Sequence, residues 1–316
     1  MSLLEAKIVY KPFRYPWCYD AWLTQQRVHW IPEEVPLADD VKDWHKKLTP
    51  EERHTLTQIF RFFTQADIEV NNCYMQHYAK VFKPTEVQMM LAAFSNIETV
   101  HIAAYSYLLD TIGMPETEYQ AFLHYKEMKD KYDYMQGFNC DSKEDIAKTL
   151  AVFSGFTEGL QLFASFAILL NFPRFNKMKG MGQIVSWSVR DESLHTESMT
   201  KLFRTFISEN SEIWTEDLQR EIYVSCTNVV EHEDAFINLA FELGGVEGLK
   251  VGVSAALGDV WGIRNGQGYT AASNLDTIKR ACTIETIIRP MQSNSVIYFR
   301  RLASTQTTLT RNKFMK

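Results

Sequence analysis

Two Glu-x-x-His units constrain the fold of this 316-residue chain more than any other feature of its sequence. They are Glu98-Thr-Val-His101 and Glu192-Ser-Leu-His195, and both stand in long stretches whose apolar residues recur at helical spacing. Residues three apart on a helix share one face, so each unit presents a carboxylate and an imidazole side by side. The sequence therefore contains two similar half-sites, each on its own predicted helix.

One further acid precedes each unit at a similar distance. Asp67 lies 31 residues before Glu98, and Glu158 lies 34 residues before Glu192. In the first half, about 16 residues lead from the acid to a proline break and about 14 lead back, or roughly 24 Å and 21 Å of helix at ~1.5 Å per residue. The second half has a proline break of its own, and the helix lengths before and after that break are similar to those in the first half. Two antiparallel helical hairpins would thus bring each acid level with its Glu-x-x-His unit.

Four carboxylates and two imidazoles are the ligand set of a carboxylate-bridged pair of metal ions inside a four-helix bundle. Carboxylates suit hard divalent cations, and imidazole adds a preference for iron, manganese or cobalt. Two divalent ions would neutralise the four acids, which could then lie in an apolar core. A single Glu-x-x-His is more often a surface pair on an amphipathic helix, but two units with matched acids predict a metal site. The predicted ligands are Asp67, Glu98, His101, Glu158, Glu192 and His195.

The sequence up to residue 248 predicts helices and hardly any strand-like alternation. Thr49 can cap the first long helix, Pro50 is tolerated at its first position, and Glu52 completes a capping box. Residues 1–48 are expected to be irregular, because four prolines interrupt them, and no fold is assigned to residues 249–316. The fold class is all-α, in one helical domain over 49–248. The expected helices cover about 50–83, 85–112, 116–134, 142–170, 176–208 and 216–243.

The composition of the chain indicates which cellular compartment and which kinds of partner to expect. The five cysteines are scattered without a Cys-x-x-Cys pair, which favours a reducing compartment over a disulfide framework. No apolar run approaches the length of a membrane span and no secretory signal opens the chain, so a cytoplasmic protein without a membrane partner is expected. Residues 249–316 carry ten Lys/Arg and three Asp/Glu, or +7, so the net charge of −6 leaves −13 on residues 1–248. That acidic body predicts no nucleic-acid partner.

Three more residues stand near the predicted ligands. Tyr105 follows His101 by four residues on the same helix face, where it could form a radical beside redox metals or pack in the core. Asp191 precedes the ligand Glu192 and could accept a hydrogen bond from a histidine ligand, although an isolated acid is more often at the surface. Trp30 would ordinarily be a core residue.

Together these residues form motifs that resemble the small, radical-generating subunit of class I ribonucleotide reductase, a member of the ferritin-like superfamily. The resemblance covers roughly residues 25–248, in the family's order and spacing. It implies a ferritin-like four-helix bundle core with additional helices. The motifs are Trp30-Ile-Pro-Glu-Glu-Val, Thr64-Gln-Ala-Asp67, Ser95-Asn-Ile-Glu98-Thr-Val-His101 with Tyr105, Glu158-Gly-Leu-Gln-Leu-Phe-Ala-Ser-Phe166 and Val189-Arg-Asp-Glu192-Ser-Leu-His195.

The resemblance also implies roles for these residues. One metal would be held by Asp67, Glu98 and His101, and the other by Glu158, Glu192 and His195. Tyr105 matches the tyrosine that stores a radical after the reduced metals react with oxygen. Trp30 and Asp191, with His101, match the relay between the cofactor and the subunit surface. Leu162 and Phe166 match residues of an apolar pocket beside the tyrosine.

The family reduces ribonucleotides to deoxyribonucleotides, so the resemblance implies a ribonucleotide reductase large subunit as partner and a homodimer of the small subunit. Three points stay open. The metals are two divalent ions, with di-iron favoured over dimanganese or mixed Mn/Fe. Residues 250–316 do not match the family's acidic tail, and Tyr298 could be a relay tyrosine or a structural one. The alternatives to a reductase subunit are a stand-alone dimetal oxidase and a ferritin-like iron-oxidising protein.

Overall fold

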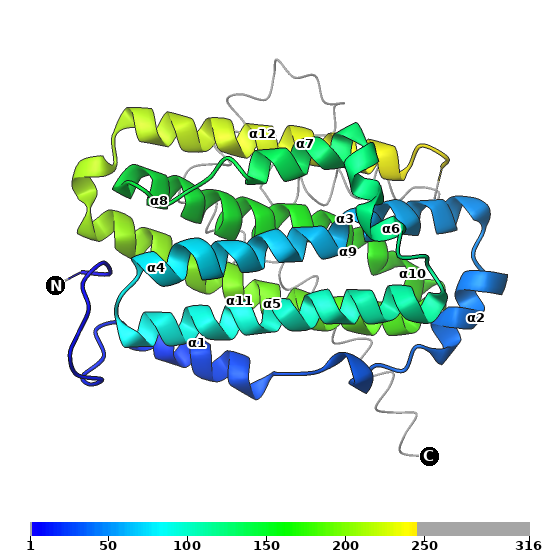
Figure 1. The fold of residues 1–316 in the computed structure, drawn as a ribbon, viewed down its shortest axis with the longest axis horizontal. Coiled ribbons are helices and arrows are strands. Elements are labelled where there is room, and N and C mark those ends of the chain that lie inside the picture. The colour runs from blue at the N-terminus through cyan, green and yellow to red at the C-terminus, as the bar shows by residue number, and fades with distance from the viewer. Residues whose placement is uncertain (1, 245–316) are drawn as a thin grey trace. The chain divides into compact units, whose positions relative to one another are not determined.

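The computed structural model describes residues 2–244, which contain helices and no β-strand (Figure 1). The predicted all-α fold is therefore confirmed for this part of the chain. The C-terminal region predicted over 249–316, with Tyr298, lies outside the described residues, and the domain boundary at residue 248 stays a prediction.

Four long helical segments form the bundle that carries the predicted ligands. The first two pack against each other as the expected hairpin, and the third packs against the fourth. Contacts between the second and fourth, and between the first and third, close the bundle. The segments are α3 (Pro50–Cys73), α5 (Thr85–Ile112), the continuous run of α8 (Lys143–Thr149), η4 (Leu150–Gln161) and α9 (Leu162–Leu169), and α11 (Lys179–Glu209).

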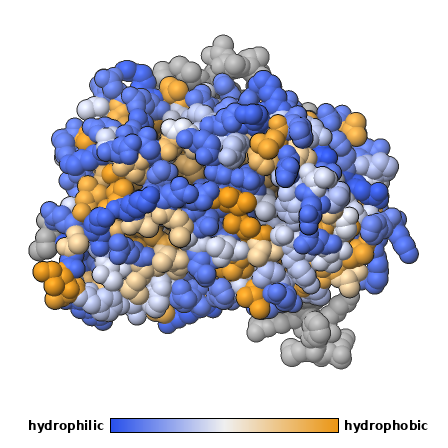
Figure 2. Space-filling view, in the orientation of Figure 1, coloured by the Kyte–Doolittle hydropathy of each residue, from blue (hydrophilic) through white to orange (hydrophobic). Residues whose placement is uncertain are grey.

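Further helices cover this bundle. α1 (Pro16–Arg27) packs on α5 and α11, and α12 (Glu216–Ala240) packs on η4 and on α7 (Lys126–Met135). Hydrophilic residues dominate the face shown in Figure 2, and apolar residues form small patches between them. The short elements are η1 (Pro32–Glu34), α2 (Ala38–Lys46), η2 (Tyr74–Tyr78), α4 (Ala79–Val81), α6 (Glu118–Ala121), η3 (Phe122–His124), α10 (Asn171–Arg174) and η5 (Ser211–Ile213).

The prediction that residues 1–48 are irregular is wrong, because this segment contains α1 and α2. Pro16 begins α1 instead of breaking a helix, since the first turn needs no amide hydrogen from proline. α2 also docks on the bundle: Asp40 accepts hydrogen bonds of 2.8 Å from the amides of Gly180 and Met181 at the start of α11. A carboxylate at that end satisfies two free amides and complements the helix dipole.

The helix over 116–134 was also predicted wrongly, because it is divided into α6, η3 and α7. Tyr125 between them is extended, with φ −105° and ψ 120°. Arg61 of α3 donates a 2.7 Å hydrogen bond to the Tyr125 hydroxyl, and its guanidinium lies 4.9 Å from the ring centroid. This tertiary contact overrides the local helical preference. Two other ends are as predicted: the Thr49 capping box is in place, and Gly113 is left-handed at φ 79° after α5.

Two segments of π-helical turns interrupt the bundle helices where the sequence predicted regular α-helix: η2 has 5 residues and η4 has 12. Such turns insert residues without ending the helix and are frequent at functional sites. Here η4 carries Glu158, and η2 begins at Tyr74, whose hydroxyl donates a 2.8 Å hydrogen bond to Glu158 Oε1. The irregular turns therefore set the position of one predicted ligand and its hydrogen-bond donor.

Residues Lys143–Arg174 form one helical stretch that is long and apolar enough, by length and composition, to cross a membrane. The expectation that no apolar run reaches this length is thus corrected. In the structure 89% of its most apolar window is buried against the other helices. A helix surrounded on all sides by protein is apolar all round, which accounts for its composition.

A buried ion pair links α7 to α12. Lys131 and Glu233 are 2% and 1% exposed, and the Lys131 ammonium lies 4.6 Å and 4.3 Å from the ring centroids of Phe62 and Phe236. We expect Lys131→Met to lower the free energy of unfolding by about 3–5 kcal/mol, because Glu233 would stay buried without its partner. Replacing both residues by Met and Leu should restore most of the loss. Urea unfolding of the two variants checks this, and equal stabilities would contradict it.

Candidate metal centre

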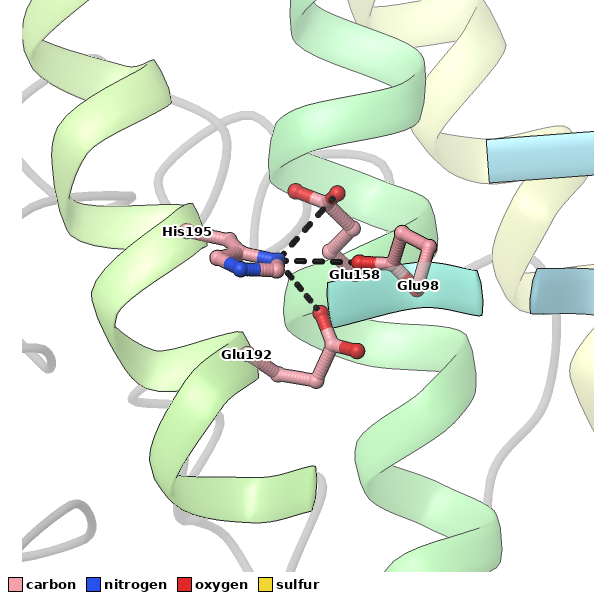
Figure 3. A group of neighbouring side chains, drawn as sticks. All are labelled: Glu98, Glu158, Glu192 and His195. Carbon is pink, nitrogen blue, oxygen red and sulfur yellow. Dashed lines mark ion pairs between the residues drawn. The ribbon is translucent and has the colours of Figure 1, made fainter. Parts of the chain in front are cut away.

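The structure brings the six predicted ligands into the core of the bundle, each no more than 1% exposed. Ligand atoms of four of them, Glu98, Glu158, Glu192 and His195, all lie within 4.8 Å of one another (Figure 3). His101 joins this group through its contacts with the same glutamates. Asp67 is fully buried and interacts electrostatically with Glu98 and both histidines. The helical register inferred from sequence therefore holds in three dimensions.

Glu98 and Glu192 each lie between the two histidines. The Glu98 oxygens are 3.4 Å from His101 Nδ1 and 3.0 Å from His195 Nδ1. The Glu192 oxygens are 3.1 Å from His101 Nδ1 and 3.4 Å from His195 Nδ1. Each carboxylate thus directs one oxygen toward each half-site. This is the arrangement that two carboxylates need to bridge a pair of cations.

The outer nitrogens of the two histidines are held by other side chains. His101 Nε2 lies 3.3 Å from Asp191 Oδ2, and His195 Nε2 lies 3.2 Å from Gln25 Oε1. With a hydrogen on Nε2 donated to these oxygens, each Nδ1 faces the carboxylates and offers a lone pair only after its own proton has left. Metal-binding histidines are oriented in this way by partners on the nitrogen that does not bind.

Many polar atoms of this cluster are buried and have no hydrogen-bond partner. Leaving one buried polar atom unsatisfied costs about 1–3 kcal/mol, so a folded protein rarely gathers several. Coordination of two cations would satisfy all of them at once, and the donor set fits that role. The atoms are Asp67 Oδ2, both oxygens of Glu98 and Glu192, Glu158 Oε2, and Nδ1 of His101 and His195.

Burial and mutual contact shift the pKa values of these groups. Burial raises the pKa of Asp67 and Glu158 well above the usual range. Burial also acts to raise the pKa of Glu98, but its close contacts with both histidines outweigh it and lower that pKa. For His195, burial acts to lower the pKa, but contacts with the two shared glutamates raise it to about 10. In the metal-free protein, protons therefore balance part of the negative charge.

These shifts predict that metal binding strengthens as pH rises. A histidine whose pKa is near 10 holds a proton at neutral pH, and a cation must displace that proton to reach Nδ1. Apparent affinity should rise on the order of tenfold per pH unit for each displaced proton. Titration of the metal-free protein with Mn²⁺ between about pH 6 and 8 measures the slope. An affinity independent of pH would contradict the assignment of protonated histidines.

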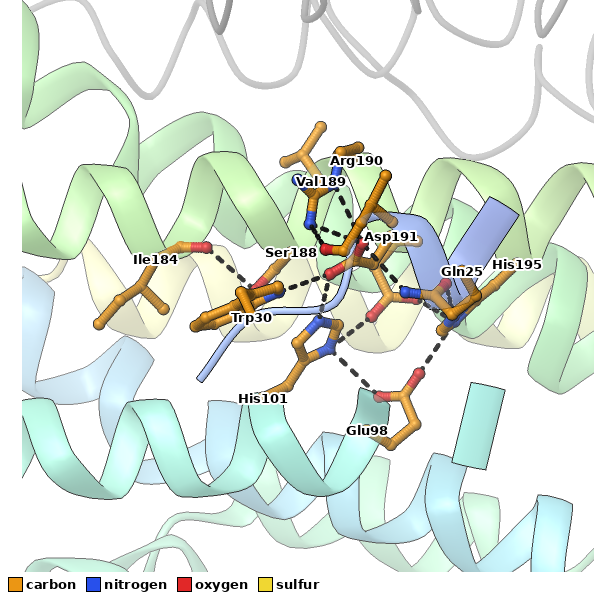
Figure 4. Close-up of polar contacts among 12 residues, drawn as sticks. Gln25, Trp30, Glu98, His101, Ile184, Ser188, Val189, Arg190, Asp191 and His195 are labelled. Carbon is orange, nitrogen blue, oxygen red and sulfur yellow. Dashed lines mark hydrogen bonds and ion pairs between the residues drawn. The ribbon is translucent and has the colours of Figure 1, made fainter. Parts of the chain in front are cut away.

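A hydrogen-bond network connects the cluster to Trp30 (Figure 4). Trp30 Nε1 donates a 2.8 Å hydrogen bond to Asp191 Oδ2, the oxygen that also faces His101. Gln25 Nε2 donates to Asp191 Oδ1 at 3.3 Å, so Gln25 joins His195 to the same carboxylate. Hydrogen bonds and charge from His101 outweigh burial and lower the pKa of Asp191. Sequence reasoning missed Gln25, because it lies in the segment predicted to be irregular.

Tyr105 lies on α5 four residues after His101 and is buried, 1% exposed. Its ring centroid is 4.6 Å from that of Phe63, which in turn lies 5.3 Å from that of Phe166. The apolar pocket of Leu162 and Phe166 beside the tyrosine stays a prediction. Burial and the charge of Asp67 raise the pKa of Tyr105 well above its usual range, which keeps the phenol protonated. Its hydroxyl donates a 3.0 Å hydrogen bond to Ser188 Oγ. Sequence reasoning did not anticipate this polar contact.

The family follows from comparison with known proteins. A family model described as "Ribonucleotide reductase, small chain" matches residues 7–253. The chain belongs to the ribonucleotide reductase small-chain family. It is 48% identical over 260 residues to a protein of Invertebrate iridescent virus 6 described as a probable ribonucleoside-diphosphate reductase small subunit, and the match covers 77% of this chain and 72% of that protein. The resemblance carried by the motifs is confirmed, and the chain is a small subunit of this oxidoreductase.

Solved structures of ribonucleotide reductase small subunits share its fold. The R2 subunit from Clostridium botulinum matches with a TM-score of 0.79 at 20% identity, covering 96% of this chain and 94% of that one. A Streptococcus sanguinis structure described as dimanganese(II)-NrdF matches with a TM-score of 0.65 at 16% identity, covering 88% and 100%. These likenesses confirm the ferritin-like bundle expected from the family resemblance.

Proposed function

We propose that this subunit binds two divalent metal ions that react with oxygen, and that it stores the resulting radical on Tyr105. The observation that carries the proposal is the placement of Glu98 and Glu192, each of which directs one oxygen to each histidine Nδ1. When bound, the metal pair supplies the oxidising power for removal of one electron from a nearby side chain. Asp67, Glu98 and His101 would hold one ion, and Glu158, Glu192 and His195 the other.

Tyr105 is the side chain proposed to be oxidised. With the metal pair bound, oxidation would remove one electron from this ring, and its phenolic proton would pass to the carboxylate cluster, in which Asp67 is the acid whose charge acts most strongly on this phenol. Phe63 and Phe166 keep water and reductants away from the ring, as a stored radical requires. Tyr105 therefore lies near the carboxylate cluster and is protected from water and reductants.

Trp30, Asp191 and His101 form the proposed relay to the partner. The shared Asp191 oxygen accepts from Trp30 and faces His101, and the Trp30 and His101 rings lie 5.9 Å apart. One electron can thus travel between the cluster and Trp30 while protons stay within hydrogen bonds. The proposed partner is the ribonucleotide reductase large subunit, with this subunit as a cytoplasmic homodimer that binds neither nucleic acid nor membrane.

The proposed metals are iron, manganese or a mixed pair, with di-iron as the first expectation. The ligand set suits all of these, and the dimanganese relative of Streptococcus sanguinis supports manganese as the second. A stand-alone dimetal oxidase or an iron-oxidising protein would share the cluster. Such proteins have no need of a relay through Trp30, which favours the reductase subunit here.

The experiment that tests the proposal loads the purified metal-free protein with Fe²⁺ or Mn²⁺ without oxygen and then adds oxygen. We expect two ions per chain by elemental analysis, followed by the EPR signal of an organic radical. Full metal occupancy with no radical would overturn the radical proposal. Binding of fewer than two ions would overturn the ligand assignment.

The relay makes a separate prediction for Trp30→Phe. The ring volume is largely kept and the metal ligands are untouched, so metal content and the EPR signal should stay close to those of the wild type. Ribonucleotide reduction with the large subunit should fall to background, because the indole that accepts the electron is missing. Tyr223→Phe, a part-exposed aromatic change on α12, serves as the control. Normal turnover of Trp30→Phe would remove Trp30 from the relay.

A further inference from the structure

The hydrogen bond between Tyr105 and Ser188 is the polar contact that the structure gives the phenol (Figure 4 shows Ser188). Ser188 is completely buried on α11, four residues and thus one helical turn before the ligand Glu192. Its hydroxyl donates to the carbonyl of Ile184 at 3.2 Å and accepts from Tyr105 at 3.0 Å. Because a serine hydroxyl has one hydrogen, it cannot donate to both oxygens together.

Oxidation of Tyr105 would change the hydrogen-bonding capacity of the oxygen that faces Ser188. The phenol loses its hydrogen, and its oxygen can then only accept a hydrogen bond. Ser188 Oγ would otherwise present a lone pair to another lone pair 3.0 Å away, inside the buried core. Rotation about the Ser188 Cβ–Oγ bond turns its hydrogen from Ile184 to the phenoxyl oxygen. The move needs no backbone shift and no new atom.

Loss of the hydrogen bond from the Ser188 hydroxyl to the Ile184 carbonyl costs little free energy. Ile184 lies inside α11, where the helix supplies its carbonyl with the backbone amide of Ser188. The serine hydroxyl is therefore a second donor to an oxygen that keeps its first one. Serine bonds of this kind to the carbonyl four residues earlier add little to helix stability. The Ser188 hydroxyl can therefore donate to either acceptor, the Ile184 carbonyl or the Tyr105 oxygen.

We propose that Ser188 is a positioning residue that donates a hydrogen bond to the Tyr105 radical, after accepting one from the reduced phenol. This inference rests on the proposed radical function. The serine keeps its proton throughout: the electron leaves Tyr105 for the metal centre, the phenolic proton leaves for the carboxylate cluster, and Ser188 only reorients. The stored radical is thus hydrogen-bonded by a buried serine, beside the ring of Phe63.

High-field EPR and deuterium ENDOR test this on the full-length, metal-loaded protein after long incubation of the metal-free form in D₂O. In the wild type we expect one exchangeable deuteron coupled to the phenoxyl oxygen. In Ser188→Ala that coupling should be lost and the largest g value of the radical should rise, because the hydrogen bond no longer draws spin from the oxygen. Ser188→Cys, which is similar in size and a weaker donor, should lie between the two.

Ser193→Ala is the matched control, since Ser193 lies on the same helix and its hydroxyl bonds the carbonyl of Val189 at 2.6 Å. It should leave the coupling and the g value unchanged. A wild-type radical without an exchangeable deuteron, or an unchanged coupling in Ser188→Ala, would overturn the role of Ser188 alone. A fully loaded wild-type protein without any radical would overturn the proposed function, and this inference with it.

Discussion

Glu192→Gln is expected to abolish the binding of both metal ions, although it changes one carboxylate to an amide of nearly the same shape. Glu192 directs one oxygen to each half-site, at 3.1 Å and 3.4 Å from the two histidine Nδ1 atoms. An amide carries no charge and offers one oxygen in place of two, so the site would lose one negative charge and one of the two oxygens that face the half-sites. Loss of a residue that only hydrogen-bonds a ligand lowers metal affinity about 10- to 100-fold. Loss of a ligand that serves both half-sites should lower the affinity for both ions by more than that.

Glu197→Gln provides the control for this substitution. Glu197 is exposed on the same helix, five residues further on, and its loss makes the same change in net charge. The control should bind two ions per chain by elemental analysis, whereas Glu192→Gln should bind close to none. Circular dichroism of both metal-free proteins would show whether the fold is kept. Loss of only one ion in Glu192→Gln would show that this carboxylate serves a single half-site.

The grouping of the proposed ligands in the bundle core could be predicted from sequence because these residues obey helix periodicity. Glu98 and His101, three residues apart, had to share a face, and the proline break before α5 fixed how far the chain runs before it returns. These are local rules that packing did not change. The same is true of the capping box at Thr49, where the two expected hydrogen bonds are present.

Contacts between distant segments could not be predicted in this way. Gln25 reaches His195 across 170 residues of sequence, and Ser188 reaches Tyr105 across 83. Nothing in the local pattern around Gln25 distinguishes it from a surface glutamine, because its partner is fixed only when α1 docks on α5 and α11. The π-helical segment η4 likewise has no local signal in the sequence, whose periodicity predicted a regular α-helix there.

Tyr105→Phe is expected to remove the stored radical completely while both metal ions remain bound. The hydroxyl is the group that loses a proton when the ring is oxidised, and phenylalanine has none to lose. No predicted ligand is altered, so metal content should match that of the wild type. Loss of the hydrogen bond to Ser188 should lower the free energy of unfolding by only about 1 kcal/mol. Ribonucleotide reduction with the large subunit should fall to background.

Tyr78→Phe separates this effect from the general loss of a buried hydroxyl. Tyr78 is equally buried, at 1% exposed, and its hydroxyl bonds the carbonyl of Thr149 at 3.1 Å, outside the ligand cluster. The control should keep the EPR signal, the metals and the turnover, with a similar change in stability. If Tyr105→Phe retained an EPR signal of unchanged shape and yield, the radical would have to reside on another side chain. The dimetal centre could then still be correct, because its ligands do not depend on the identity of the oxidised residue.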